Sequence, residues 1–507
     1  METVRTDVVI AGAGPVGLLL AAELRLRGTE VIVLEQLDAP SPHSRAFGLH
    51  ARSTESLRLR GLLGRLERAA EQPTRMFGAV LPDGIKNDLV PLIHFAGIRT
   101  LRLDRMETSS PGLLGVAQSG AEAVLADWAA ELGVRLRRGQ QVTAVTQDSD
   151  GVTVTAEAAT GPLEVRARYL VGCDGGRSAV RKLTGFAFPG SDPTITGRLC
   201  ETLVPELLAD PGPGWHRLPG GVLQVLPGRI LSVEFDRPQV DRELPVTVEE
   251  FTDSLERITG RRIELATEPT WLTRFTDNSR LAEHYRLGRV LLAGDAAHVH
   301  SPFGGQGLNL GLQDAMNLGW KLAAAVAGRA PEGLLDSYQQ ERQPVAARVL
   351  HNTRAQVALM NPSAGVTPLR ELFADLMELE PVNRLLAELL SGVSVRYQRR
   401  DEDHPLTGTF LPDLRVSTEE AGECSALDLL ADGRPLLLDF TEGAVLRATA
   451  HDWADRVRPI ATAVPSGTKL TALLVRPDGY LAWATQDAAP DEHGLREALS
   501  TWFGPAR

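Results

Sequence analysis

The sequence predicts an α/β fold in which a domain built on a parallel sheet is interrupted by a mainly antiparallel β-sheet and followed by a smaller α/β domain. Residues 7–11 form a mostly apolar run typical of buried parallel strands, and the pattern returns at residues 290–293. Between residues 186 and 275, proline and glycine are frequent and short alternating stretches favour antiparallel strands. After a boundary at residues 404–412, apolar runs again alternate with helical segments.

Composition and charge exclude several classes of function. The chain has 507 residues, which at roughly 150 residues per domain suggests about three domains. A net charge of −12 argues against a nucleic-acid partner, and no apolar run reaches the ~18 residues that a membrane span needs. Three cysteines without a Cys-x-x-Cys pair fit a reducing cytoplasm and give no redox dithiol. We therefore expect a cytoplasmic monomer or homodimer with neither a nucleic-acid nor a membrane partner.

A glycine motif follows the first predicted strand and opens a helix. Gly12, Gly14 and Gly17 have the G-x-G-x-x-G spacing, with Pro15 inside the motif. The first glycine permits a tight turn, the second lets a pyrophosphate approach the backbone, and the third lets the helix pack on the strand. Glu35 ends the next predicted strand, where it can accept ribose hydroxyl groups. This combination predicts a Rossmann-like dinucleotide site but does not choose between NAD and FAD.

Two later segments resemble the second FAD motif of the aromatic-ring flavoprotein monooxygenases. They are Gly288–His298 (GRVLLAGDAAH) and Pro302–Asn309 (PFGGQGLN). In that family the aspartate matching Asp295 binds the ribityl chain, and the following loop lies beside the isoalloxazine ring. The loop residues expected to contact FAD are Pro302, Gly305, Gly307, Leu308 and Asn309. A helix that begins near Gly307 would aim its positive end at the charge of reduced flavin.

Three further segments carry narrower matches. Gly172–Arg181 resembles the family's D-G motif, which is associated with the pyrophosphates of FAD and NAD(P)H, so Asp174 is an expected FAD contact. Arg177 and Arg181 are candidates for NAD(P)H phosphate binding, although surface salt bridges explain each arginine about as well. The remaining expected FAD contacts are Arg45, Gln118 and Val142. His298 and His300 lack a further ligand at metal-binding spacing, so we expect no metal.

Taken together, the motifs make the chain similar to class A FAD-dependent aromatic-ring monooxygenases. It resembles in particular the aromatic polyketide hydroxylases of actinomycete angucycline, anthracycline and tetracycline pathways, over essentially its whole length. The resemblance implies tightly but non-covalently bound FAD, NADPH or NADH as transient electron donor, and O₂ as co-substrate. It implies hydroxylation of a polycyclic aromatic polyketide through a flavin hydroperoxide. Leu310 departs from the pattern of phenol-hydroxylase relatives, many of which carry threonine there.

The resemblance also implies a division of the chain. We expect an FAD-binding domain from residues 1–75, 111–185 and 276–398, the last of these including a helical segment. Residues 76–110 and 186–275 would form the substrate-binding domain. Residues 399–507 look like the thioredoxin-like domain appended in this subgroup, but without Cys-x-x-Cys.

No pattern identifies a catalytic acid or base, because the flavin carries the chemistry in this family. The substrate should lie between flavin and inserted sheet, and the pocket candidates, each of which also fits plain core, are Phe77, His94, Phe95, Trp215, His216, Leu223, Phe235 and Pro302. Two alternatives stay open. One is Baeyer–Villiger insertion or quinone-forming oxidation on the same substrates. The other is a flavin reductase or binding protein that does not use oxygen.

Overall fold

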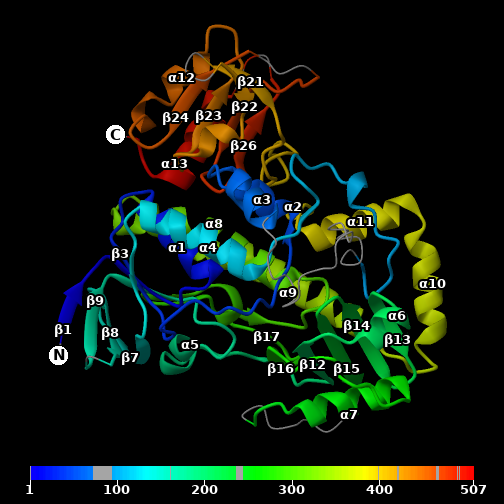
Figure 1. Cartoon of the computed structure of the whole chain (residues 1–507). Coiled ribbons are helices and arrows are strands. Elements are labelled where there is room, and N and C mark those ends of the chain that lie inside the picture. Colours follow the sequence, from blue (N-terminus) through cyan, green and yellow to red (C-terminus); the bar gives the residue numbers. More distant parts are fainter. Residues whose placement is uncertain are drawn as a thin grey trace.

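The computed structural model describes residues 2–71, 94–159, 161–235, 244–397, 399–418, 422–463, 467–487, 489 and 491–506 (Figure 1). It confirms the predicted α/β fold, with an inserted antiparallel sheet and a separate C-terminal α/β domain. In Figure 1 the C-terminal domain lies at the top, above the parallel sheet and its helices, and the inserted sheet lies at the lower right. Phe77 falls outside the described residues.

A six-stranded sheet forms the centre of the first domain. Its strand order is β18 (Arg286–Leu287), β19 (Val290–Leu292), β10 (Tyr169–Gly172), β2 (Val8–Ala11), β3 (Val31–Leu34) and β6 (Arg135–Arg137). All neighbours pair in parallel except β18 and β19. Every residue of β2, β3, β10 and β19 is buried, as expected for strands covered on both faces.

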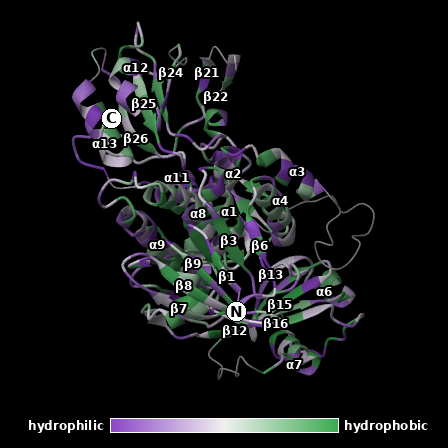
Figure 2. Cartoon of the chain, turned by 90° about the vertical axis from the view of Figure 1, so that its left-hand side faces the viewer, coloured by the Kyte–Doolittle hydropathy of each residue, from purple (hydrophilic) through white to green (hydrophobic). Residues whose placement is uncertain are grey.

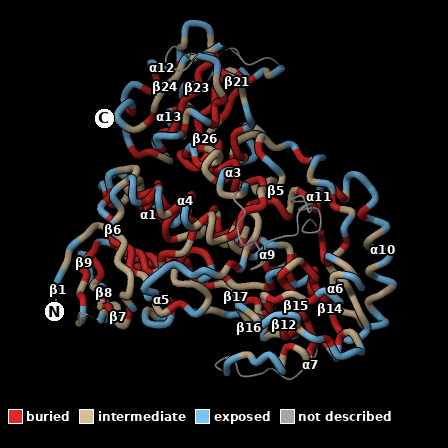
Figure 3. The backbone as a smooth tube through the Cα atoms, viewed as in Figure 1, coloured by how far each residue is buried: buried red, intermediate tan, exposed pale blue. Residues whose placement is uncertain are grey.

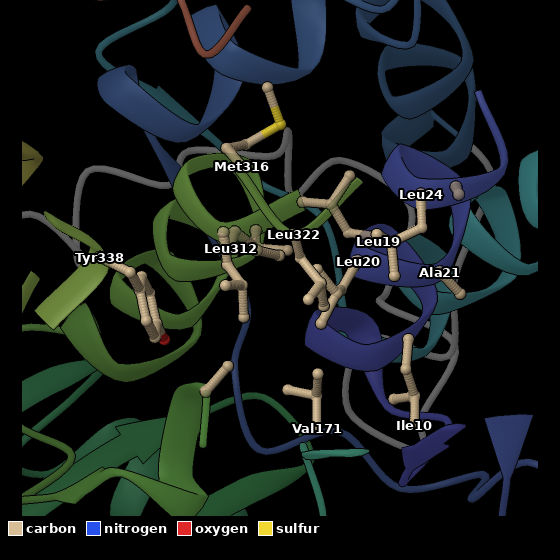
Figure 4. Packing of buried hydrophobic residues seen from close by; sticks show 14 of the residues in the cluster. Ile10, Leu19, Leu20, Ala21, Leu24, Val171, Leu312, Met316, Leu322 and Tyr338 are labelled. Carbon is tan, nitrogen blue, oxygen red and sulfur yellow. The ribbon is translucent and has the colours of Figure 1, made fainter. Parts of the chain in front are cut away.

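Three helices cover one face of this sheet. They are α1 (Pro15–Arg25), α4 (Gln118–Glu131) and α8 (Gln306–Val326). Leu19 and Leu20 of α1 meet Leu312 and Leu322 of α8 above the strands (Figure 4).

A four-stranded sheet joins the same hydrophobic core, in the order β1 (Glu2–Arg5), β9 (Leu163–Ala167), β8 (Val152–Glu157) and β7 (Gln141–Gln147). Two short helices, α2 (Ala51–Arg58) and α3 (Leu63–Glu71), follow β4 (Leu49–His50), which pairs with β5 (Leu113–Leu114).

The inserted sheet has five antiparallel strands. Their order is β13 (Gly214–Leu218), β14 (Gly221–Leu226), β15 (Arg229–Phe235), β12 (Ile195–Glu201) and β16 (Trp271–Thr276). Its outer face is covered by α6 (Pro205–Ala209) and α7 (Val248–Thr259), helices that the alternating pattern did not predict. Helix α7 begins where the Thr247 side chain accepts from Glu250 N–H and ends at left-handed Gly260, while Phe251, Leu255 and Ile258 form its buried stripe. Its opposite side is exposed (Figure 3).

Three consecutive helices link the sheets. Helix α9 (Asp336–Met360) leads toward the inserted sheet, and α10 (Thr367–Met377) and α11 (Glu380–Ser391) follow it. Buried residues from the end of α9 and from α10 and α11 form one cluster with residues of the 95–106 segment and with Val222 and Val233 of the inserted sheet. The first part of α9 packs in the core of the first domain. Short strands β11 (Gly190–Ser191), β17 (Ser279–Leu281) and β20 (His298–Val299) form a bridge between the two domains, and α5 (Ala179–Leu183) follows β10.

The C-terminal domain has its own sheet, in the order β24 (Arg458–Ala461), β23 (Leu436–Asp439), β25 (Ala472–Val475) and β26 (Leu481–Thr485). It is flanked by α12 (Val445–Thr449), α13 (Glu492–Phe503) and the hairpin of β21 (Arg415–Thr418) and β22 (Gly422–Ser425). Hydrophobic residues follow its strands, as they do in the other sheets (Figure 2). A search of the described residues finds no helix with the length and hydropathy needed to cross a bilayer.

Buried ion pairs fasten the C-terminal domain to the first domain. Arg476, which follows β25, contacts Glu341 of α9 at 2.5 Å, and Lys321 of α8 contacts the same carboxylate at 2.6 Å. Asp478 pairs with Arg476 from the other side at 2.5 Å. Burial alone would raise the pKa of Glu341, but Arg476 and Lys321 hold it at about 2. The carboxylate therefore stays ionised at neutral pH, and the stability it contributes is lost only as the pH falls toward that value.

Replacing Arg476 with methionine should destabilise the protein strongly, because the carboxylates of Glu341 and Asp478 would remain buried with less compensating charge. We expect the free energy of unfolding, measured in urea, to fall by about 3–5 kcal/mol. Arg415→Met is the matched control, since Arg415 and its partner Glu423 are 64% and 70% exposed and their pair is screened by solvent. Equal unfolding curves for the two variants would contradict this account of the interface.

Candidate functional site

The three glycine-containing motifs meet at the carboxyl ends of β2, β10 and β19. A Cβ added to Gly12 would lie 2.4 Å from the carbonyl oxygen of Cys173, so the first motif touches the D-G segment. A Cβ on Gly294 would lie 3.2 Å from the side chain of Val16, so the loop after β19 touches helix α1. Ligands of open α/β sheets bind at this edge, where parallel strands end and their loops come together.

The first motif has the geometry of a phosphate loop. Gly12 has a φ of +102°, and a Cβ on Gly17 would lie 2.0 Å from the carbonyl oxygen of Gly12, so both positions require glycine. Around the Cβ position of Gly14, in contrast, no atom lies within 4 Å. Pro15 is in the first turn of α1, whose unpaired N–H groups lie directly beyond this open space. The loop thus leaves room for a pyrophosphate at the positive end of a helix.

Glu35 lies beside this loop at the end of β3. One carboxylate oxygen accepts a hydrogen bond from Ala13 N–H at 2.7 Å, and the other accepts from Leu37 N–H at 2.9 Å. An ionised carboxylate has about four acceptor positions, so these bonds fix its orientation while leaving capacity for ligand hydroxyl groups.

Asp295 and His300 place two acceptors near the start of α8. Asp295 is exposed in a 3-10 turn, and none of the described residues donates a hydrogen bond to its carboxylate. His300 Nδ1 donates to the carbonyl of Ser301, which leaves Nε2 as a buried acceptor without a partner among those residues. A Cβ at Gly307 would lie 3.6 Å from His300 Nε2 and 4.0 Å from Asp295 Oδ1. These two acceptors fit a chain of hydroxyl groups that donate hydrogen bonds, such as the ribityl chain of FAD.

A buried carboxylate positions the loop that carries Asp295. Asp314 Oδ2 accepts from Gly294 N–H at 3.1 Å and lies 2.7 Å from His298 Nε2, while Oδ1 accepts from Arg342 Nε at 2.8 Å. Burial alone would raise the pKa of Asp314, but His298 and Arg342 lower it below its usual value. His298 therefore serves this network, and no cluster of potential metal ligands occurs in the described part of the chain.

The loop between Pro302 and α8 is held by Asn309. Its side chain accepts from His50 N–H at 2.8 Å and donates to the carbonyl of Gly305 at 3.0 Å. Gly305 is the N-cap of α8 and has a φ of 63°. Asn309 thereby joins strand β4 to the glycine loop, while Gly307 and Leu308 are partly buried in the first turn of α8.

The remaining expected contacts are more scattered. Arg45 is exposed beside the same region, and Gln118 N–H donates to the carbonyl of Ala46, which brings these two positions together. Val142 lies in β7, within the hydrophobic core. Asp174 accepts hydrogen bonds from Ser178 and Val180, so it caps α5.

The two candidate phosphate arginines differ in environment. Arg181 is buried, donates to the carbonyls of Ala296 and Gly176, and stacks on the ring of Phe188 at 3.9 Å. Its guanidinium is thus used within the fold. Arg177 is exposed.

A cavity separates the glycine loop from the inserted sheet. Its walls come from residues 45–50, the loop 302–305, the start of β15 and the end of α11. The lining residues are Arg45, Ala46, Phe47, Gly48, His50, His94, Leu103, Gly112, Leu113, Trp215, Gln224, Leu226, Arg229, Leu231, Pro302, Phe303, Gly304, Gly305, Leu390 and Ser391. Most of these are apolar or aromatic, as is usual for small-molecule sites.

Three of the predicted pocket residues, His94, Trp215 and Pro302, line this cavity. Phe95 and Phe235 lie in the adjoining hydrophobic cluster. Leu223 and His216 do not line it, because side chains alternate along a strand and Leu223 packs with Phe251 on the outer face. His216 pairs directly with Leu223 across β13 and β14 and so shares that face.

Two neutral histidines face the cavity in opposite tautomers. Burial lowers the pKa of His50 to about 4, and its Nδ1 bonds to the carbonyl of Leu390, so the proton lies on Nδ1 and Nε2 is an acceptor. Burial, with Arg99 and Arg370, lowers the pKa of His94 to about 3. His94 Nδ1 accepts from Gly97 N–H, so its proton lies on Nε2. The cavity thus offers one ring acceptor and one ring donor.

Sequence reasoning missed His50, Gln224 and Arg229 as lining residues. His50 lies a short distance along the chain from Arg45, an expected FAD contact, and this proximity in the sequence was the available signal. Gln224 and Arg229 alternate along their strands with core residues, and this alternation was the available signal. To use it, one must know which face of the sheet a helix covers.

Two family models match the chain. The model described as "FAD binding domain" matches residues 5–353, and the one described as "Aromatic-ring hydroxylase, C-terminal" matches residues 404–506. The glycine cradle at Gly14 and the acceptors at Asp295 and His300 fit the cofactor that the first description names.

Similar proteins cover the same length. A 12-dehydrotetracycline 5-monooxygenase/anhydrotetracycline 6-monooxygenase of Streptomyces rimosus is 45% identical over 99% of each chain. A dialkyldecalin synthase of Streptomyces rugosporus is 40% identical over 98% of this chain and 99% of its own. The solved structure of the OxyS anhydrotetracycline hydroxylase from Streptomyces rimosus is 42% identical, with a TM-score of 0.88 over 99% of this chain and 100% of that one. This chain belongs to the FAD-binding family of aromatic-ring monooxygenases.

Proposed function

We propose that this protein hydroxylates a polycyclic aromatic polyketide, using FAD, NAD(P)H and O₂. The observation that carries the proposal is the cavity between the Pro302–Gly305 loop and the inserted sheet, which is lined mostly by apolar and aromatic side chains. Trp215 and Phe303 contact each other edge to face at a ring-centroid distance of 5.3 Å and form part of that wall. The names of the similar proteins support the substrate class, since they include a hydroxylase of anhydrotetracycline.

In this proposal the chain's own residues hold the cofactor at the sheet edge. The N–H groups of α1 beyond Gly14 bind the pyrophosphate, Glu35 accepts ribose hydroxyl groups, and Asp295 accepts from the ribityl chain. The first turn of α8 presents its N–H groups to the ring. Bound flavin supplies the reduction of O₂ and the electrophilic oxygen.

The cavity residues orient the substrate and keep out water. His94 donates from Nε2 and His50 accepts at Nε2, so a hydroxyl and a carbonyl oxygen of one planar molecule can be bound at separate points. Leu226, Leu231 and Leu390 supply apolar walls. A site of this kind, which is closed to water, protects reactive intermediates from side reactions with solvent.

A second candidate function is a non-oxidative ring closure with FAD as a structural group. It is favoured by the similarity to the dialkyldecalin synthase, whose name describes a synthase and not an oxygenase. Baeyer–Villiger insertion and quinone formation also stay compatible with the cavity.

Because NAD(P)H is supplied inside cells and all three cysteines are free thiols, we further propose that the protein is cytoplasmic. We propose that it is a monomer or a homodimer.

Asp295→Ala should remove most of the bound FAD. A hydrogen bond to a charged group is worth about 1.5–3 kcal/mol, so the dissociation constant should rise about 10- to 100-fold. The measurement is flavin absorbance of purified protein and fluorescence titration of the apoprotein. Asp336→Ala is the control, because Asp336 is exposed at the start of α9 and its one ion pair among the described residues is with Arg286. Full flavin retention by Asp295→Ala would refute the assignment of this carboxylate.

Turnover with O₂ labelled with heavy oxygen separates the candidate functions. Hydroxylation should place one labelled atom in the product for each NAD(P)H consumed, on a ring carbon, as mass spectrometry of fragments would locate. Insertion next to a carbonyl would give a labelled ester instead. An unlabelled product of unchanged oxygen content would favour the synthase function and contradict the proposed hydroxylation.

A further inference from the structure

Arg229 is a buried arginine whose charge has no acid in contact among the described residues. It is 5% exposed, and Nε and Nη1 lack a hydrogen-bond acceptor in that part of the chain. Most other buried guanidinium groups of the described residues contact an acid: Arg198 contacts Glu234, Arg342 contacts Asp314, and Arg476 contacts Glu341. Arg181, which is also buried, instead donates to two backbone carbonyls. An unpaired buried cation is costly, so its retention needs an explanation.

The side chain lines the cavity. Arg229 begins β15, and because side chains alternate, it shares a face with Leu231 and Val233, which also face inward, while Ile230 packs outward against α7. The guanidinium carbon lies 4.0 Å above the centroid of the Phe47 ring, which holds the plane in place.

Among the described residues, no acid lines the cavity beside Arg229. The charged and titratable lining residues are Arg45, His50, His94 and Arg229, with neither aspartate nor glutamate in the described lining. Glu201, on the neighbouring strand β12, is the acid that acts on Arg229 electrostatically, and it forms no ion pair with it among the described contacts. Burial lowers the pKa of Arg229 to about 9, so the group remains a cation at neutral pH. The cavity therefore has an uncompensated positive potential beside its aromatic walls.

We propose that Arg229 is an oxyanion subsite, which binds the ionised phenolate or enolate oxygen of the aromatic substrate. This inference rests on the proposed function and adds the ionisation state and orientation of the substrate. A planar guanidinium offers several fixed donors, of which the Nε and Nη1 groups are unused. The phenol that binds in this way releases its proton to solvent, and the resulting anion is both oriented and made electron-rich for attack by an electrophilic oxygen.

Binding of a coloured probe tests the subsite without turnover. The dihydroxyanthraquinone alizarin changes colour on ionisation and absorbs then at longer wavelengths than flavin, whereas its dimethyl ether cannot ionise. Both would be titrated into the oxidised, FAD-loaded protein without NAD(P)H, at the pH at which free alizarin is half ionised. We expect the wild-type protein to bind the coloured anion preferentially, and Arg229→Gln to weaken alizarin binding about 10- to 100-fold with little effect on the ether.

Two further variants control for structural damage. Arg229→Lys keeps a cation without the planar fork and should retain part of the anion preference. Arg217→Gln removes an arginine from neighbouring β13 that bonds to Asn361 and Thr367, and it should leave the preference unchanged. Flavin content and melting temperature identify any variant that fails to fold.

The outcomes separate this inference from the proposed function. Wild-type protein that binds neither probe, or binds alizarin only as the neutral form, overturns the subsite, and so does a folded Arg229→Gln variant that keeps the anion preference. Loss of labelled-oxygen incorporation with an intact Arg229 effect would overturn only the hydroxylation. Labelled product with an unaffected Arg229→Gln variant would overturn only the subsite.

Discussion

The buried carboxylate of Asp314 is the interaction on which the cofactor side of the molecule depends. Its oxygens form hydrogen bonds with Gly294, His298 and Arg342 at once. These bonds fix the loop after β19, helix α8 and helix α9 relative to one another. Each of these partners would be left unsatisfied in a buried setting if the carboxylate were absent. Helix α8, which carries Asp314, also carries Asn309 at one end and Lys321 near the other. This one helix therefore holds both the glycine loop and the contact with the C-terminal domain.

The two sides of the site differ in chemical character. At the sheet edge, Asp295 and His300 Nε2 are acceptors and α1 and α8 begin, which suits a polar cofactor with phosphate and hydroxyl groups. Across the Pro302–Gly305 loop, the walls are apolar and the charges are cationic. The loop is therefore the boundary where a polar cofactor and an apolar, acidic substrate would meet.

The glycine motifs could be found from the sequence because much of their requirement is local: Gly12 has a φ of +102°, and a Cβ on Gly17 would meet the carbonyl oxygen of Gly12. The alternating strands of the insertion were also visible. Which strand face lines the cavity was not visible, since it depends on α7 covering the other face, and Leu223 and His216 lie on that other face. Arg229 carries no motif at all; its importance follows from its burial beside the cavity without an acid in contact among the described residues.

Side chains alternate between the two faces of β14 and β15, and the two faces serve different purposes. Residues that face α7 must keep a packed core, whereas Gln224, Leu226, Arg229 and Leu231 border a cavity. Changes at every second position can therefore alter the accepted molecule while the fold and the cofactor edge stay intact. A gene duplicate of such a protein would need few substitutions, all on one face of this sheet, to accept a new molecule.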